Sequence, residues 1–385
     1  MIYKNNKFEY NFKKTFDSLI CKHRYNYSYK KVKIPHDPII LVCNCCTKDD
    51  AKLIAASFSV PMSFAADASH LENEGIKVDL TSAYTAIPIY PASSNAAACV
   101  QIIRRIRAGY SVCVFPEGKR SGDGLTSDFT DSVARLVKKL GVCMVTYKID
   151  GAYMSHPSWA KNARRGKTYG HTICVYPESN IRKMSNLSIY QAIKSDLDTD
   201  AVASEGEYRT KFDGKRLAEG IENQLYACPC CKYLNTLTSN GNKIICKKCQ
   251  KIGEIDAFGN ITEFGFSNVR DWSDWQSRMI GKLPFVSTEK EIAFDEFCTL
   301  LEIGHGYKKE TVSKSRLSIT NFAIRIGDLE ILFDKIKRAE LTFDSDLAFS
   351  LNDGGNNHFE IRKEGGYAAN MYLDILNRFR RTKSD

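Results

Sequence analysis

Residues 115–124 read FPEGKRSGDG and decide the fold of this chain. They follow the short apolar run SVCV at 111–114, which places the glycines, the proline and the charges where a buried strand ends and a loop begins. In α/β sheets, ligands bind at the carboxyl ends of the strands. Glycines let the backbone approach a ligand closely, while Lys119 and Arg120 supply a point charge and a planar guanidinium that suit phosphate. The segment therefore predicts a site for an anionic, phosphorylated substrate.

Strand-like and helical patterns alternate through the first 200 residues. Four apolar runs have the length of buried strands, at 39–43, 111–115, 142–149 and 172–176. Two helical patterns, at 95–108 and 132–140, each end at a glycine, Gly109 and Gly141. This alternation predicts an α/β domain at 36–200, with a mixed sheet flanked by helices.

The string FPEG followed by x-Arg-Ser resembles the third sequence block of the glycerolphosphate and lysophospholipid acyltransferase family. The family's first block is Asn-His-x-x-x-x-Asp after an apolar strand. Here residues 44–50 read NCCTKDD after the apolar run at 39–43, so Asn44 and Asp50 match in register and Cys45 takes the place of the histidine. The resemblance covers residues 36–180 and is closest to bacterial members of the 1-acylglycerol-3-phosphate acyltransferase type.

The resemblance implies a specific chemistry. In the family, the histidine, oriented by the aspartate, removes the proton from a glycerol hydroxyl that then attacks an acyl thioester. A thiol with a pKa of about 8.5 is mostly protonated at neutral pH, and a nearby carboxylate such as Asp50 raises that pKa further. Cys45 is thus a poor general base. Three interpretations stay open: a packing residue in a weakened enzyme, a nucleophile that holds the acyl group as a thioester, or a histidine from elsewhere, His36 or His156, as the base.

The remaining site residues are likewise implied by the resemblance. Asp50 orients the group at the base position, Glu117 and Gly118 shape the cleft, and Arg120 with Ser121 holds phosphate. We count Cys45, Asp50 and Glu117 as candidate catalytic residues. The candidate substrate-binding residues are Asn44, Gly118, Lys119, Arg120 and Ser121. The family's second block carries a phosphate-binding arginine, but no basic residue follows the apolar run at 86–89 until Arg104, so Lys119 and Arg120 have to hold most of the phosphate.

Composition predicts a protein that works at a membrane surface from the cytoplasm. The 385 residues are 43% hydrophobic and carry a formal net charge of +10, which favours acidic partners. No apolar stretch is long enough to span a bilayer, and the N-terminus lacks the apolar region of a signal peptide. Basic residues interleave with Tyr and Phe in a basic N-terminal segment at 1–35, which favours binding at the inner face of the membrane. An exposed basic helix face explains the same pattern.

Two Cys-x-x-Cys knuckles predict a zinc ribbon. Cys228 with Cys231 and Cys246 with Cys249 have the spacing of four thiolates that close a tetrahedral site. Cys230 is a spare cysteine that could compete as a ligand. A closed four-cysteine site has a structural role, since no coordination position stays open. Lysines around the knuckles allow a second interpretation, a phosphate-contacting nucleic-acid surface.

Beyond the ribbon, the pattern changes to short alternating segments. Strand-like segments are expected at 316–326, 329–333, 339–343, 347–351 and 358–361, before an amphipathic helix at 367–381. This arrangement resembles a pleckstrin-homology-type barrel. We expect a helix at 215–226 plus the ribbon within 201–265, and a β-rich pleckstrin-homology-like domain at 266–385.

The sequence therefore predicts an acyltransferase-like protein of phospholipid biosynthesis. Its partners would be acyl-CoA or acyl carrier protein as donor, and lysophosphatidic acid or a related lysophospholipid as acceptor. One alternative is a catalytically impaired relative that binds lipid as a scaffold. A second is a zinc-ribbon protein that binds nucleic acid. Because that alternative leaves the FPEGKRS string unexplained, the sequence argues against a nucleic-acid partner.

Overall fold

The computed structural model describes residues 7–30, 34, 38–68, 85–202, 210–284, 290–304, 308–352 and 358–381. They divide into two compact units. Unit 1 comprises Met1–Tyr90, Ser94–Ser158 and Ala163–Asp213, and unit 2 comprises Pro91–Ser93, Trp159–Asn162 and Gly214–Asp385.

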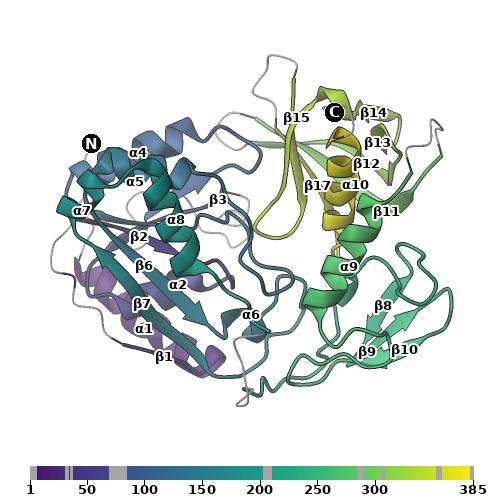
Figure 1. Cartoon of the computed structure of the whole chain (residues 1–385), viewed down its shortest axis with the longest axis horizontal. Helices are drawn as coiled ribbons and strands as arrows, with labels where there is room; N and C mark the ends of the chain where they lie inside the picture. The colour runs from purple at the N-terminus through teal and green to yellow at the C-terminus, as the bar shows by residue number, and fades with distance from the viewer. Residues whose placement is uncertain are drawn as a thin grey trace. The chain divides into compact units, whose positions relative to one another are not determined.

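Unit 1 is a mixed sheet of strands in the order β1-β7-β6-β2-β5-β3-β4 (Figure 1). The strands are β1 (Tyr27–Tyr29), β2 (Ile39–Cys43), β3 (Met62–Asp67), β4 (Thr85–Ile89), β5 (Ser111–Val114), β6 (Cys143–Asp150) and β7 (Thr168–Tyr176). Only the β6–β7 pairing is antiparallel among the described strand pairs of this sheet. The predicted mixed α/β sheet is therefore confirmed.

Helices cover both faces of this sheet. They are α1 (Lys7–Tyr25), α2 (Asp50–Ser57), α4 (Ala96–Arg107), α5 (Ser132–Leu140), α6 (Ala152–Ser155), α7 (Glu178–Lys183) and α8 (Asn186–Leu197). β2 shows why its sequence is apolar throughout. Ile39, Leu41 and Cys43 pack into the core under α1 and α2, while Ile40 and Val42 pack into the core under α4, α5 and α8. A strand covered on both faces needs a continuous apolar run rather than an alternating one.

Unit 2 begins with turns where the sequence predicted a helix at 215–226. The structure has only the short 3₁₀ helix η1 (Ile221–Asn223) there, so that prediction is wrong. Gly220 has φ +93°, and a Cβ at this position would lie 2.1 Å from the carbonyl oxygen of Trp159. A helix cannot accommodate this left-handed backbone or the close approach that it permits.

The rest of unit 2 is a small β region, one helix and an antiparallel sheet. The small β region holds β8 (Leu237–Asn240), β9 (Lys243–Cys246) and β10 (Ile252–Glu254), followed by α9 (Val269–Gly281). The larger sheet has the order β14-β13-β12-β11-β17-β16-β15. Its strands are β11 (Ala293–Ile303), β12 (Lys309–Ile319), β13 (Ala323–Ile326), β14 (Leu329–Leu332), β15 (Ile336–Leu341), β16 (Leu347–Leu351) and β17 (His358–Lys363), and α10 (Ala369–Arg381) follows.

The predicted antiparallel domain with a terminal helix is thus confirmed. Met371, Ile375 and Phe379 lie on the face of α10 that packs into the sheet's core. The sequence missed β11, which pairs with both β12 and β17. Among the helices that the structure describes, none combines the length and the apolar composition needed to cross a membrane.

Candidate functional site

Three loops of unit 1 meet at one edge of its sheet. β6, β2 and β5 are adjacent and parallel, so the segments that follow them emerge at the same edge. These segments are 44–50 after β2, 115–124 after β5, and 151–158 after β6. The FPEGKRS string and the Asn-Cys-Cys motif, predicted to form one site, therefore lie side by side. The third loop brings His156 to the same edge.

Glu117 joins the first two loops. Its Oε1 accepts the backbone N–H of Cys45 at 3.1 Å, and its Oε2 accepts that of Ser127 at 2.8 Å. The backbone N–H of Ser121 donates to the carbonyl oxygen of Cys45 at 3.4 Å, which closes a second link. Burial raises the pKa of Glu117 to about 7, against the opposing effect of the two N–H donors. This buried carboxyl group thus connects the loop after β2 to the loop after β5.

Asp50 is held by its own loop. Its carboxylate accepts the backbone N–H of Cys46 at 2.6 Å, the backbone N–H of Thr47 at 3.0 Å and the Thr47 hydroxyl at 2.7 Å. Burial raises its pKa to about 6, although these hydrogen bonds favour the ionised form. The described contacts fix the loop after β2 and include no side chain at position 45. That Asp50 orients a catalytic group stays a prediction.

Cys45 is a protonated, buried thiol. It is 1% exposed, and burial together with the charges of Asp50 and Glu117 holds its pKa well above the ordinary value. Only the thiolate of a cysteine is a strong nucleophile or a proton acceptor. The surroundings of Cys45 therefore suit a packing residue better than a base or a nucleophile.

Asn44 connects the loop after β2 to β6. Its side-chain carbonyl accepts the backbone N–H of Ile149 at 2.9 Å, and its amide donates to the carbonyl oxygen of Ile149 at 3.3 Å. The amide also donates to the Cys46 sulfur at 3.2 Å. The residue is 2% exposed. These contacts show a clamp that sets the loop's position, whereas a direct contact with substrate stays a prediction.

The predicted phosphate loop combines a half-buried cation, Lys119, with a buried one, Arg120. Gly118 is exposed with φ +67°, a backbone that favours glycine, and Lys119 beside it has no ion-pair partner among the described residues. Arg120 is 4% exposed and donates from its guanidinium to the carbonyl oxygen of Ser158 at 3.4 Å. Its positive charge acts on Cys45, Asp50 and His156. This loop therefore brings positive charge into the centre of the three-loop edge.

Ser121 shapes this loop. Its hydroxyl accepts the backbone N–H of Gly124 at 2.9 Å and donates to the carbonyl oxygen of Leu125 at 2.9 Å. Both contacts are internal, so this side chain keeps the loop closed around the two cations.

An acidic residue that the sequence did not single out anchors α1 to the site. Asp49 accepts hydrogen bonds from the Tyr25 hydroxyl at 2.6 Å, the Arg24 guanidinium at 3.1 Å and the Lys52 ammonium at 2.6 Å. It is 5% exposed. No local pattern could reveal this, since the partners on α1 lie about two dozen positions away in the chain.

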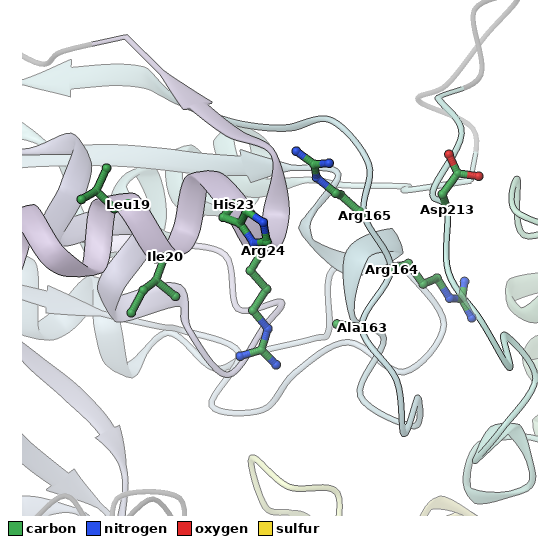
Figure 2. Close-up of a pocket in the computed structure, with 8 residues that line it drawn as sticks. All are labelled: Leu19, Ile20, His23, Arg24, Ala163, Arg164, Arg165 and Asp213. Atoms are coloured by element: carbon green, nitrogen blue, oxygen red, sulfur yellow. The ribbon is translucent and has the colours of Figure 1, made fainter.

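A groove of about 700 Å³ opens beside this anchor, between α1 and the segment at 163–165. Figure 2 shows Leu19, Ile20, His23 and Arg24 on the helix, and the second wall opposite them. That second wall consists of Ala163, Arg164, Arg165 and Asp213. Leu19 is 63% exposed and Ile20 39%, so one wall is apolar and open while the groove as a whole is rich in arginine. The groove therefore suits an amphiphile with an anionic head.

The groove is tied to the three-loop edge on both sides. Arg24 donates to Asp49 in the loop after β2, and the backbone N–H of Arg164 donates to the carbonyl oxygen of Ser155 at 2.7 Å. Ser155 directly precedes His156. The other histidine considered from the sequence, His36, lies outside the described residues.

Four cysteines of unit 2 form a cluster that could hold a metal ion. The sulfur atoms of Cys228, Cys231, Cys246 and Cys249 all lie within 4.8 Å of one another. The Cys228–Cys249 and Cys231–Cys246 sulfur pairs are 3.8 and 3.7 Å apart. Zinc–sulfur bonds of about 2.3 Å in a tetrahedron require sulfur separations of about 3.8 Å. The donor set therefore fits zinc, and the exposed spare cysteine, Cys230, is not part of the cluster.

The two knuckles repeat one backbone geometry. Lys232 donates its backbone N–H to the carbonyl oxygen of Cys228 at 2.8 Å, and Gln250 donates its own to that of Cys246 at 2.9 Å. Both residues have positive φ, +61° and +60°. Each follows the second cysteine of its knuckle, so two equivalent turns present the sulfurs to one point. Zinc bound there would crosslink the two turns and stabilise the small β region.

Comparison with known proteins finds one family model that matches part of unit 1. The Acyltransferase family model matches residues 25–150, about a third of the chain. No curated protein matches the sequence.

Two solved structures resemble parts of the chain. The 1-acyl-sn-glycerophosphate acyltransferase PlsC from Thermotoga maritima aligns at 18% identity and a TM-score of 0.39, covering 49% of this chain and 78% of that one. The Vps36 N-terminal pleckstrin-homology domain aligns at 15% identity and a TM-score of 0.21, covering 27% of this chain and 89% of that domain.

The family match spans β2, α2, β5 and β6, together with the Asn-Cys-Cys and FPEGKRS loops that the structure brings together. The resemblance seen in those motifs is thus confirmed at the level of the family. Residues 25–150 of this chain are an acyltransferase-family domain.

Proposed function

We propose that unit 1 transfers an acyl chain from an acyl thioester, of coenzyme A or acyl carrier protein, to the free hydroxyl of a lysophospholipid. Lysophosphatidic acid is the default acceptor. The observation that supports this most is the three-loop edge, where Glu117 braces the two family motifs while Lys119 and Arg120 supply positive charge for a phosphate. The family match supports acyl transfer as the reaction, and the charges of Lys119 and Arg120 support a phosphorylated acceptor.

The groove beside α1 also supports a lysophospholipid as the acceptor. An apolar wall at Leu19 and Ile20 next to arginines suits a single acyl chain that ends in an anionic head. The same exposed apolar pair on a basic helix supports a second proposal, contact with an anionic membrane from the cytoplasmic side. The acceptor would then reach the site from the bilayer surface.

The phosphate assignment is tested by acyl transfer to lysophosphatidic acid and to a monoacylglycerol with the same acyl chain. The unmodified chain should prefer the phosphorylated acceptor. Lys119→Ala and Arg120→Lys should each lower kcat/KM for that acceptor by about 10- to 100-fold, because a charge-assisted hydrogen bond contributes about 1.5–3 kcal/mol. The monoacylglycerol rate should change little.

A matched control is Arg135→Ala on α5. This arginine is exposed and pairs only with Asp131 among the described residues, so its loss should not alter acceptor choice. Equal rates with both acceptors in the unmodified protein would contradict the phosphate assignment.

A second candidate function is favoured by the buried, protonated Cys45. A chain without a working base could bind lysophospholipid through the same groove and loop without transferring an acyl group. Binding of lysophosphatidic acid in calorimetry, without product from any donor, would identify this function.

A further inference from the structure

We propose that the His156 imidazole is the general base that takes the acceptor's hydroxyl proton, a role that the motif position cannot fill with Cys45. The inference rests on the acyl transfer proposed above. It assigns a new catalytic position on the third loop of the same edge.

Hydrogen bonds place His156 against the phosphate loop. The backbone N–H of Ser158 donates to the carbonyl oxygen of Ser121 at 3.4 Å, and the Arg120 guanidinium donates to the carbonyl oxygen of Ser158 at 3.4 Å. On its other side, the backbone N–H of His156 donates to the carbonyl oxygens of Ala152 and Tyr153, which ends α6. The segment that carries His156 is therefore tied to the phosphate loop, and the charge of Arg120 acts on the histidine.

The three candidate catalytic residues of the two motif loops have other contacts. Both oxygens of Glu117 accept backbone N–H groups, and both oxygens of Asp50 accept hydrogen bonds from their own loop. Cys45 is a buried thiol beside those two carboxyl groups. Glu117 and Asp50 are thus engaged in holding the loops, and the Cys45 thiol is protonated, so none of the three is presented to an acceptor hydroxyl by the described contacts.

His156 differs from them in having an unused ring nitrogen. The residue is 7% exposed, and its Nδ1 is buried without a hydrogen-bond partner among the described residues. A buried polar atom without a partner is costly, so such an atom in a polar site indicates a missing ligand or water. With the ring proton on Nε2, Nδ1 has the lone pair that a general base needs.

Burial and the charges around His156 keep it neutral. Burial is the largest cause that lowers its pKa, to about 4, and Arg120, Arg24 and Lys48 add to it while Asp49 opposes them. A base this weak works poorly at neutral pH. An acceptor phosphate bound beside these three cations would offset their charge, and an opposite charge within about 4–6 Å raises the pKa of a histidine by about 1–3 units. The anionic acceptor would thus strengthen its own base.

The step balances without any further reactant. His156 takes the proton as the acceptor oxygen attacks the thioester carbonyl carbon, and a tetrahedral intermediate forms. Its collapse breaks the carbon–sulfur bond, and the thiolate takes the proton from the imidazolium. The products are an ester and a free thiol, and His156 returns to its neutral state.

The kinetic test compares His156→Gln with the unmodified chain, using acyl-CoA and lysophosphatidic acid. His156→Gln should lower kcat by at least about 100-fold, with an unchanged melting temperature, since general bases contribute about 10²–10⁴-fold. His171→Gln is the matched control, because His171 lies on β7 beside Asp150 and not on the three loops. A kcat within twofold of the unmodified value in His156→Gln would overturn the proposal.

A second test needs no variant to be active. The pKa of His156 is measured by NMR of the full chain with ¹⁵N-labelled histidine, alone and with sn-glycerol 3-phosphate or glycerol, and the signal is assigned by its loss in His156→Gln. A rise of about one unit or more with the phosphate and none with glycerol supports the proposal. An unchanged pKa overturns it. If the phosphate raises the pKa of His156 but the chain transfers no acyl group, both the role of His156 as a base and the proposed function are overturned. The anion site would still be supported.

Discussion

Glu117 and Cys45, 72 positions apart in the chain, are joined by a 3.1 Å hydrogen bond from the cysteine's backbone N–H to the carboxyl group. The bond connects the third motif of the acyltransferase family to the position where the first motif has its histidine. Glu117 accepts from the backbone, so this link survives any side chain at position 45. The connection between the two motif loops therefore does not depend on a histidine at position 45.

Glu117 makes stability depend on pH. Its folded-state pKa is raised from 4.5 to about 7 by burial, so its contribution to the free energy of unfolding is fully present below pH 4.5 and is lost as pH rises through 7. The unmodified chain should lose about 3 kcal/mol more than Glu117→Gln between pH 4.5 and 7.5. Urea unfolding at several pH values measures both. Parallel pH profiles for the two proteins would show that Glu117 is ionised freely in the fold.

Cys45→Ala distinguishes a packing role of Cys45 from a role as a nucleophile. Because the thiol is buried and protonated, the variant should keep acyl transfer within several-fold and lose about 1 kcal/mol of stability from the small cavity. Loss of activity by 100-fold or more, with accumulation of an acylated protein in the unmodified chain, would instead show a nucleophilic cysteine. Mass spectrometry of the intact protein after mixing with acyl-CoA detects that intermediate.

Cys45→His restores the motif residue. If the motif position can act as a base, this change should rescue His156→Gln by at least about 10-fold in kcat. The larger side chain must fit a fully packed position, so a loss of about 1–3 kcal/mol is expected in the unfolding free energy. A rescued double variant with a lower melting temperature would agree with both expectations. No rescue in a folded double variant would show that position 45 does not face the acceptor.

The four-cysteine cluster should hold one zinc ion per chain. Cys246→Ser should remove the metal and lower the melting temperature by at least about 4 °C, since a structural zinc site stabilises the fold directly. Cys230→Ser is the control, because Cys230 is exposed and outside the cluster. Elemental analysis and thermal unfolding give the two readouts. One zinc retained in Cys246→Ser and lost in Cys230→Ser would reverse the ligand assignment.

The apolar wall of the groove should contribute to acceptor binding. Leu19→Ser should weaken binding of monomeric lysophosphatidic acid by about 5- to 20-fold, from the lost burial of one side chain. Leu187→Ser is matched, because Leu187 on α8 is also 63% exposed and lies outside the groove. Calorimetry below the critical micelle concentration measures both. An equal effect of the two changes would indicate that the groove does not hold the acyl chain.

The sequence correctly predicted those helices and strands that depend on residues close together in the chain. The helix at 132–140 is found at α5, and Gly141 ends it with φ +62°. The failed helix at 215–226 had a good pattern, but the close approach of Gly220 to Trp159 depends on a distant segment and leaves no local signal. Similarly, the cysteine spacing alone predicted which four sulfurs gather.

The sequence predicted which motifs form the candidate site but not the environment of their side chains. The strings around Cys45 and Glu117 located two of the loops. The burial of His156, and the charges that keep it neutral, arise only when the 155–158 segment packs on the phosphate loop. The anchor from Tyr25 to Asp49 likewise joins residues that share no pattern in the sequence.

The most direct test of the account is product formation by the unmodified, zinc-loaded chain. Lysophosphatidic acid is mixed with labelled acyl-CoA or acyl carrier protein, and the lipids are resolved by mass spectrometry. The account predicts phosphatidic acid in a quantity that grows with enzyme concentration and falls by at least about 100-fold in His156→Gln. No phosphatidic acid from either donor, with an intact fold and bound zinc, would contradict the proposed acyl transfer.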